Sequence, residues 1–553
     1  MCAGSISSGG VQVPRKILRN TGLLLAAILL IACGGGGAAN PGASSPAQSL
    51  AVPDLGSVAA QNLGSQLPEG WQRGPFMQIH VRAYQDSNGD GVGDLRGLMA
   101  RLDYLQSLGV RGLWLLPVNE SADRDHGYAV RNYRAIEPDY GTIEDMRALL
   151  DAAHQRGIGV ILDHVINHAS SQHPLFLNAR SSPGDLHRQF FVWQPQVPSG
   201  WLIYGRNPWY ATSNGAYFAP FWSGMPDFNW RHTPVRDFHH DNLRYWLNLG
   251  VDGFRFDAVG HLVENGPGAW DNQPENHGIM AGVREVVQSY SRRYMVCESP
   301  GASRAFAAAS SCGSAFAFDL KDAVLRSARG NDPQAVQEVA NYFVSAPAGM
   351  ATFLANHDRF AGDRIWHQMG GDEAAYRMAA STYLMLPGTP FIYYGEEIGM
   401  AHARGLQGDQ ALRAPMSWSS AADGFSSGKP FRAAAENLAT HNVALQKADP
   451  QSLLSTYRRL IALRNAHAPL HSGAYREAGS QGQVLAFERY TAEQRMLVLV
   501  HYGRTAGRVT LNLPADSRWR AIEGATGTRT ADAGGRALFD VQPQSLSVYE
   551  FLQ

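Results

Sequence analysis

Short apolar runs alternate with longer amphipathic segments through the middle of the chain. Between the runs, apolar residues recur at helical spacing, as at 142–156, where a Thr opens the periodic stretch, and at 234–249. Eight apolar runs of strand length lie at 78–83, 112–117, 159–163, 253–256, 294–297, 315–318, 352–354 and 391–394. A strand followed by a helix, repeated eight times, predicts an α/β fold with a parallel sheet closed into a (β/α)8 TIM barrel.

Two regions depart from this alternation. The third and fourth predicted strands are separated by more chain than one helix needs, and this interval is rich in Trp, Pro, Gly and Ser. Near the C-terminus, short β runs at 484–490, 496–500, 508–513 and 545–551 predict an antiparallel β-sandwich. We therefore expect a barrel at 70–169 and 226–465, an inserted lobe at 170–225 and a C-terminal sandwich at 466–553.

The N-terminal segment has the pattern of an export signal. Basic residues precede an apolar run at 22–32 that is too short to remain as a membrane-spanning helix. The run ends in Leu-Ile-Ala-Cys, which resembles a bacterial lipobox with Cys33 as the lipidated residue; an ordinary signal peptide with an incidental cysteine is the alternative. Residues 34–69 predict a flexible tether. We expect an exported protein, anchored through this lipid on the periplasmic face or the cell surface.

Four cysteines are too few for a disulfide scaffold. Cys2 and Cys33 lie in the leader, which leaves Cys297 and Cys312 in the folded part. An exported compartment permits a bond between them, but free cysteine commonly packs as a small hydrophobe. We therefore expect two buried thiols.

Composition narrows the class of partner. The chain has 47 basic and 48 acidic side chains, so it lacks the excess positive charge with which proteins bind nucleic acid or anionic lipid. Its 12 Trp and 21 Tyr suit either a large core or stacking platforms for sugar rings. The two alternatives are nearly balanced for the aromatic residues of the predicted lobe, which are Trp193, Trp201, Tyr204, Trp209, Tyr210, Tyr217 and Trp222. The near-zero net charge is compatible with an uncharged partner.

Polar residues follow the predicted strands where a barrel of this kind carries its reactive groups. One carboxylate at a strand end is often a turn residue. Several carboxylates around one arginine repel one another and cost stability, which a purely structural role does not explain. The sequence therefore predicts an active site at this end of the barrel. The residues concerned are Asp163, His164, Asn167, His168, Arg255, Asp257, His261, Glu298, Asn356, His357 and Asp358.

The same segments resemble the signature regions of the α-amylase superfamily, glycoside hydrolase family 13. The matching segments are DHVINH at 163–168, GFRFDAVGH at 253–261, Glu298, FLANHD at 353–358, MPDFN at 225–229 and GTPFIYYGEEIG at 388–399. They occur in the family's order, and the resemblance extends over residues 70–553. The MPDFN segment is typical of intermediate branches between α-amylases and oligo-α-glucosidases.

The resemblance implies a retaining glycosidase. Asp257 would be the nucleophile that forms a covalent glycosyl-enzyme, and Glu298 the acid that protonates the leaving oxygen and then acts as base. Asp358 would hold sugar hydroxyls and favour a distorted ring. Arg255, two residues before Asp257 on the same face of its strand, would keep the nucleophile ionised.

Further sugar-binding residues follow from the same resemblance. Tyr128, in the segment His-Gly-Tyr, would stack on the sugar ring that is cleaved. His168 and His357 would donate hydrogen bonds to sugar hydroxyls, with core packing as the alternative for both. His261 and Arg413 also match positions that contact substrate in the family.

A loop after the first predicted strand resembles a calcium site. Its DSNGDGVGD sequence places oxygen donors at alternate positions, with glycines for the tight turn. The family's oligosaccharide-cleaving branches carry a structural Ca2+ there, and a bare polar turn is the alternative. The implied ligands are Asp86, Asn88, Asp90, the Val92 carbonyl and Asp94. Asn167 is also a candidate for a second Ca2+ site near the lobe.

The resemblance implies endo-hydrolysis of α-1,4-glucosidic bonds in a neutral α-glucan or malto-oligosaccharide, as in an α-amylase, and we expect a monomer. Branches that trim single glucoses usually carry Asp directly after the Gly-Tyr pair, where it pairs with an arginine and closes the cleft. This chain has Ala129 there, while Arg413 resembles the partner arginine. The alternatives are an exo-acting α-glucosidase or oligo-1,6-glucosidase, and an α-glucanotransferase. A non-catalytic binding homologue does not fit, because all three acids are present.

Overall fold

The computed structural model describes residue 53 and residues 55–552. The predicted leader and its lipobox Cys33 lie outside the described residues. Residues 55–69, within the predicted tether, are attached to the barrel: the Val58 amide donates to Asp241 Oδ1 at 2.9 Å, the Gln61 amide donates to Asn248 Oδ1 at 2.8 Å, and Leu67 is buried. In this described part of the chain, no helix is long and apolar enough to cross a membrane.

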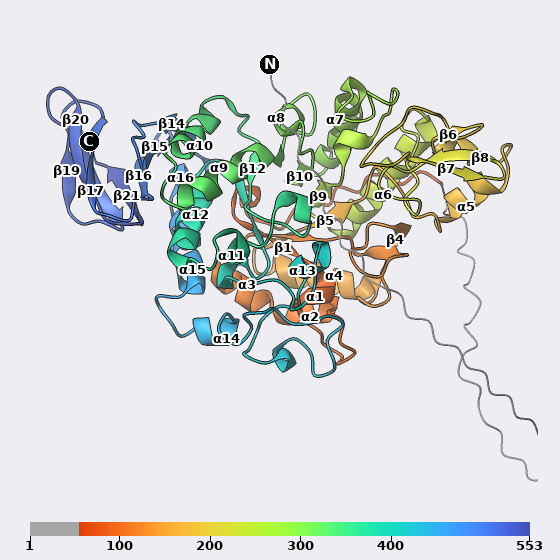
Figure 1. The fold of residues 1–553 in the computed structure, drawn as a ribbon, viewed down its shortest axis with the longest axis horizontal. Helices are drawn as coiled ribbons and strands as arrows, with labels where there is room; N and C mark the ends of the chain where they lie inside the picture. Colours follow the sequence, from red (N-terminus) through yellow and green to blue (C-terminus); the bar gives the residue numbers. More distant parts are fainter. Residues whose placement is uncertain (1–52, 54, 553) are drawn as a thin grey trace, which may run out of the picture. The chain divides into compact units, whose positions relative to one another are not determined.

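Eight parallel strands form a closed barrel, which confirms the predicted fold class (Figure 1). The last strand pairs with the first, with Phe391 opposite Phe76, so closure joins the two ends of the barrel sequence. The spatial order is β1-β13-β12-β11-β10-β9-β5-β2. The strands are β1 (Phe76–Ile79), β2 (Gly112–Leu115), β5 (Gly159–His164), β9 (Gly253–Phe256), β10 (Tyr294–Cys297), β11 (Ala315–Phe316), β12 (Met350–Thr352) and β13 (Thr389–Tyr393).

Helices separate the barrel strands along the chain. The Thr142 hydroxyl accepts from the Asp145 amide at 3.1 Å, and the Asp145 carboxylate accepts from the Thr142 amide at 3.0 Å. This reciprocal capping box fixes the start of α4 where the sequence predicts it. The main helices are α3 (Leu102–Leu108), α4 (Ile143–His154), α6 (Thr233–Leu249), α7 (Pro274–Gln288), α9 (Phe318–Ala328), α10 (Pro333–Ser345), α12 (Glu373–Met385) and α15 (Leu453–Ala466).

Several predicted strands end earlier than expected; the run 112–117, for example, ends at Leu115, and two others give way to helices. The run 78–83 divides into the end of β1 and a short helix, α1 (Val81–Tyr84), and the run 315–318 ends where α9 begins. All residues of α1 are buried. A short run in which every residue is buried shows no alternation between a buried and an exposed face, so periodicity cannot distinguish strand from helix there.

The inserted lobe has its own small sheet. Its strands β6 (Trp193–Gln194), β7 (Trp209–Thr212) and β8 (Gly215–Phe218) pair in the order β6-β8-β7, shown in yellow in Figure 1. A helix, α5 (Pro174–Ser181), precedes them. A separate pair, β3 (Asn119–Ser121) with β4 (Val130–Ile136), lies between β2 and α4 and was not predicted.

The C-terminal strands form the predicted antiparallel domain, drawn in blue in Figure 1. A six-stranded sheet and the pair β17-β20 enclose one core that includes Leu497, Leu511, Trp519 and Phe539. The sheet order is β14-β15-β16-β21-β18-β19. The strands are β14 (Ala474–Glu477), β15 (Val484–Tyr490), β16 (Arg495–His501), β17 (Gly507–Asn512), β18 (Arg518–Glu523), β19 (Thr528–Thr530), β20 (Arg536–Val541) and β21 (Ser545–Phe551).

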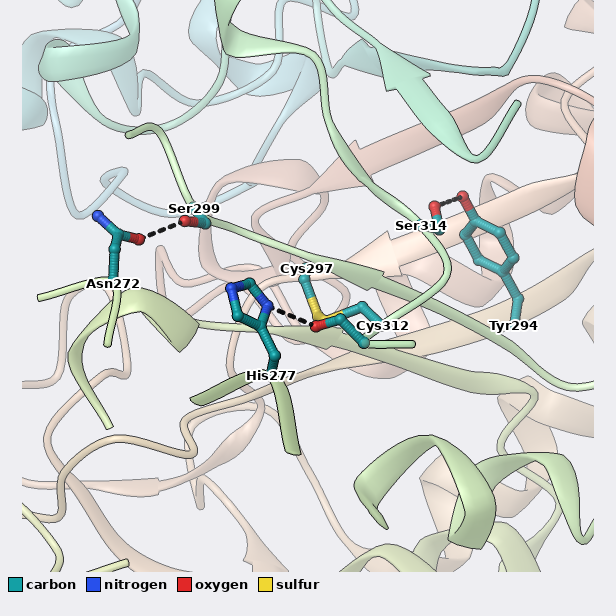
Figure 2. Close-up of a disulfide and its surroundings, with 8 residues drawn as sticks. Asn272, His277, Tyr294, Cys297, Ser299, Cys312 and Ser314 are labelled. Carbon is teal, nitrogen blue, oxygen red and sulfur yellow. Dashed lines mark hydrogen bonds between the residues drawn. A yellow bond between two sulfur atoms is a disulfide. The ribbon is translucent and has the colours of Figure 1, made fainter. Parts of the chain in front are cut away.

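Cys297 and Cys312 form a disulfide, so the expectation of two free thiols is wrong (Figure 2). Cys297 ends β10, and Cys312 lies three residues before β11. These two strands are parallel neighbours, so the connection returns close to its start and brings the Cα atoms to 6.3 Å. The hydrophobic character of the two residues predicted their burial but carried no information about this return.

Candidate active site

The carboxyl ends of the barrel strands bring the predicted acids together. Asp257 follows β9, Glu298 follows β10, and Asp358 lies on the segment after β12. All three line one cavity of about 610 Å³. The cavity therefore gathers the expected acids from three parts of the chain.

Arg255 is the centre of the site's charge network. Its side chain is fully buried, and Nη1 lies 2.8 Å from Asp163 Oδ1 and 2.9 Å from Asp257 Oδ1. Nη2 lies 2.6 Å from Glu298 Oε2. Alternation along β9 directs residues 255 and 257 to the same face, as the sequence predicts. One guanidinium thus pairs with three carboxylates.

Burial governs the protonation of these carboxylates. It raises the pKa of Asp257 well above the usual range; Arg255 opposes this, and the Glu298, Asp163 and Asp358 carboxylates reinforce it. Arg255 opposes the effect of burial on Asp257 but does not outweigh it, contrary to the expectation that it keeps this carboxyl ionised. Burial likewise raises the pKa of Asp358 to about 6, against the opposing effect of Arg413. Crowded carboxyl groups of this kind favour keeping a proton among them.

One carboxylate oxygen of Glu298 is in an ion pair, and the other has no partner in the described part of the chain. Oε2 pairs with Arg255, whereas Oε1 is buried and has no hydrogen-bond partner among the described residues. The next residue, Ser299, donates to Asn272 Oδ1 at 3.0 Å (Figure 2). The Glu298 side chain is thus fixed by its ion pair with Arg255 and by the hydrogen bond of the next residue. Its second carboxylate oxygen, Oε1, stays available to bind a ligand.

Tyr128 lines the cavity, but His357 does not. The Tyr128 hydroxyl donates to Asp163 Oδ2 at 2.8 Å and lies 2.7 Å from His357 Nε2, and the two rings stack at 5.5 Å. His357 Nδ1 is hydrogen-bonded to Gln78 Nε2 at 2.7 Å. In this arrangement His357 supports Tyr128 and Asp358 from behind, rather than facing the cavity as expected.

His168 and His261 both line the cavity as neutral imidazoles. Burial lowers the pKa of His168 to about 3 and that of His261 to about 4. His168 Nε2 has no hydrogen-bond partner among the described residues. A neutral imidazole with an unused nitrogen can hydrogen-bond an uncharged hydroxyl group.

Arg413 has a carboxylate partner that the sequence analysis missed. Its Nη2 lies 2.9 Å from Asp358 Oδ1, and its Nη1 lies 3.4 Å from Asp125 Oδ2. Asp125 also pairs with Arg432 at 2.7 Å. Burial acts to raise the pKa of Asp125, but Arg432, His80 and Arg413 hold it at about 2.

The absence of an Asp at position 129 was the reason for favouring endo-hydrolysis, and Asp125 supplies the carboxylate partner that was missing. Position 129 is alanine, but the carboxylate comes from four residues earlier in the same loop. The acidic residue three positions before Tyr128 was visible in the sequence. Only the folded loop directs it toward Arg413.

The loop at 86–94 is closed by hydrogen bonds of its own. The Asp86 carboxylate accepts from the Gly89 and Gly91 amides, both at 2.8 Å, and from the Ser426 hydroxyl at 2.6 Å. Asp94 Oδ1 accepts from the Gly97 amide at 2.7 Å and so caps α2 (Leu95–Ala100). Among the described residues, no group of three or more His, Cys, Asp and Glu side chains is arranged to hold a metal ion. Calcium at this loop stays a prediction.

A second oxygen-rich position lies where the lobe joins the barrel. Asn167 Oδ1 and both carboxylate oxygens of Asp227 are buried without hydrogen-bond partners among the described residues. Burial raises the pKa of Asp227 well above its usual range, and Glu264 reinforces the effect. Asp227 belongs to the MPDFN segment, but nothing in its spacing indicated that it would face Asn167.

Comparisons with known proteins agree with this geometry. A family model described as alpha amylase, catalytic domain, matches residues 78–473. Alpha-amylase 3 of Dictyoglomus thermophilum is 31% identical over 459 residues, covering 80% of this chain and 88% of the relative. Trehalose synthase/amylase TreS of Mycolicibacterium smegmatis is 33% identical over 476 residues, covering 76% and 80%. The crystal structure of an alpha-amylase from H. orenii matches with a TM-score of 0.75 at 32% identity, over 87% of this chain and 100% of that chain.

Proposed function

The chain belongs to the α-amylase family of glycoside hydrolases, and we propose that it hydrolyses α-1,4-glucosidic bonds of malto-oligosaccharides and starch-like glucans with retention. The main support for this proposal is the Arg255 guanidinium, which pairs with both Asp257 and Glu298 beside the cavity. A retaining reaction requires two adjacent carboxyl groups, one ionised and one protonated. The crowding of carboxyl groups around this one cation favours such a shared proton.

The proposed reaction has two steps. Asp257 attacks the anomeric carbon as the bond to the leaving oxygen breaks, and Glu298 gives its proton to that oxygen. Glu298 then removes a proton from water, which attacks the same carbon and releases Asp257. The neutral imidazole of His168 and the carboxylate of Asp358 would hydrogen-bond sugar hydroxyls, and Tyr128 would stack on the ring.

Product analysis tests this proposal. Maltoheptaose is incubated with the wild-type chain and with Asp257→Asn, and reducing ends are measured over time. We expect hydrolysis by the wild-type chain and a loss of about 10³-fold or more in the variant, within the range of enzymatic rate enhancements. Equal activity in the two proteins would refute the assignment of the nucleophile.

A second candidate is an exo-acting α-glucosidase or glucosyltransferase, because Arg413, which lines the cavity, pairs with Asp125 from the loop before Tyr128. Such an ion pair would close the cleft to sugars beyond the cleaved one. The earliest products from maltoheptaose distinguish the candidates. Oligosaccharides of several lengths support the α-amylase, whereas glucose and maltohexaose alone support the exo-acting enzyme.

We also propose structural Ca2+ sites. The loop at 86–94 supplies three carboxylates, the Asn88 amide oxygen and the Val92 carbonyl, which is the hard oxygen set that Ca2+ prefers. Asn167 and Asp227 would contribute to a second site, where their unpartnered buried oxygens need a cation to offset burial. In both places the ion would neutralise carboxylates and stabilise loops.

The proposed location is the exported face of a bacterial membrane. The support is the basic N-terminal segment, the short apolar run and the lipobox at Cys33. Fractionation tests it: Cys33→Ala should move the activity from the membrane fraction to the soluble exported fraction.

A further inference from the structure

Tyr204 occupies a backbone position that a tyrosine rarely adopts. The amide of Ile203 donates to the Arg206 carbonyl at 2.8 Å, and the amide of Arg206 donates back at 3.0 Å. Between them, φ is 49° at Tyr204 and 79° at Gly205. Two positive φ values define a primed hairpin turn, whose first central position favours Asn, Asp or Gly. Strain at such a position suggests a functional reason for the side chain.

The turn carries this side chain into the active-site cavity. Tyr204 is 62% exposed and lines the same cavity as Asp257 and Glu298. The preceding Ile203 is buried in the small core of the inserted lobe and anchors the turn. Of the seven Trp and Tyr residues that the sequence places in the lobe, only Tyr204 lines the cavity.

Trp270 supports Tyr204 from the barrel. It lies on the segment between β9 and α7, and its ring stacks on His261 at 5.1 Å with planes 5° apart. Its ring meets Tyr204 edge-on at 5.6 Å and 79°. Trp270 also packs against the core of the lobe. The tyrosine ring is thus held by the barrel and by the lobe while most of its surface stays open.

Tyr204 is linked to the acid Glu298 through neighbouring side chains. Arg413, which pairs with Asp358, lines the same cavity. Trp270, whose ring meets Tyr204, lies two residues before Asn272, and Asn272 Oδ1 accepts from the hydroxyl of Ser299, the residue after Glu298, at 3.0 Å. A proton from Glu298 goes to the leaving oxygen, so the leaving sugar lies near these side chains.

We propose that Tyr204 is the stacking platform for the leaving-group sugar, with Trp270 as its positioning residue. The inference rests on the proposed function and deepens it. The substrate class is an α-glucan whose leaving group presents the apolar face of a sugar ring to an aromatic ring. The same platform would hold an acceptor sugar for transfer.

The experiment compares substrates with and without a leaving-group sugar. Tyr204→Asn removes the ring and suits the primed turn, so the lobe is expected to fold. We expect kcat/KM on maltotriose to fall about tenfold, which corresponds to about 1.4 kcal/mol. On α-glucosyl fluoride, whose leaving group has no sugar, kcat/KM should change by less than about twofold, which is less than about a third of that free energy. Tyr204→Phe keeps the ring and should restore the activity on maltotriose.

Two further variants complete the design. Trp270→Ala should raise KM for maltotriose while kcat on the fluoride is kept, and Trp270→Phe should reverse this. Trp222→Ala is the matched control, because Trp222 is a 46% exposed aromatic residue of the same lobe that does not line the cavity. Equal losses on both substrates in Tyr204→Asn, or no loss on either, would overturn the inference. Inactivity of the wild-type chain on both substrates would instead overturn the proposed function.

Discussion

Removal of the Cys297–Cys312 disulfide should destabilise the fold by a calculable amount. The two cysteines are 15 residues apart. In the chain-entropy account, a cross-link that closes a loop of about 15 residues stabilises by about 3 kcal/mol, because it restricts the unfolded chain. Unfolding entropy is about 2.1 cal/mol/K per residue, or about 1 kcal/mol/K for a chain of about 500 residues. The melting temperature should therefore fall by about 3 °C.

The variant for this experiment is the double replacement Cys297→Ala with Cys312→Ala, which avoids leaving a reactive thiol. Scanning calorimetry of the variant and the wild type, each with and without a thiol reductant, measures the shift. The reductant should lower the melting temperature of the wild type to that of the variant and leave the variant unchanged. The argument from loop closure is refuted if the oxidised wild type and the variant melt at the same temperature.

Three other perturbations have defined outcomes. Arg255→Met leaves buried carboxylates unpaired, so the free energy of unfolding should fall by about 3–5 kcal/mol in a urea titration; an unchanged midpoint would show that Arg255 does not offset their burial. The pKa of Asp358 is raised to about 6. Its favourable contribution to the free energy of unfolding is therefore complete below about pH 4 and is lost as pH rises through 6, by up to about 3 kcal/mol. Asp358→Asn should therefore raise the melting temperature at pH 8 but not at pH 4, and an equal shift at both would contradict the assigned pKa. Calcium at about 100 times its Kd should stabilise the wild type by about 2.7 kcal/mol. Chelation should reverse this gain and Asp90→Asn should reduce it, whereas a wild type that melts alike with calcium and chelator would exclude both proposed sites.

The barrel was predictable because its elements are encoded locally. Gly253–Phe256 and Tyr294–Cys297 match β9 and β10 at both ends, and the Thr142 cap fixes the start of α4. The positions of the catalytic acids could be predicted from the strands, since a residue directly after a barrel strand lies at the catalytic end of the barrel. Position in the chain was enough to place Asp257 and Glu298.

The errors concern pairings between distant segments. Asp125 and Arg413 are 288 positions apart, and only the folded loops bring them together. His357 was expected from the family resemblance to contact sugar hydroxyls, but its ring is buried and stacks on Tyr128. The balance of burial against charge at Asp257 depends on desolvation, which a linear sequence does not contain.

The pairing of β1 with β13 has a consequence for how activity arises during folding. The register of Phe76 with Phe391 joins segments more than half the chain apart, a contact of very high sequence separation that forms slowly. Arg413 lies beyond the closing strand, whereas Asp125 lies near the opening one. A chain that is still being synthesised contains every acid of the site before the barrel that brings them together has closed. The site can therefore become active only after the barrel has closed. Until then, the chain carries its catalytic residues in an inactive arrangement.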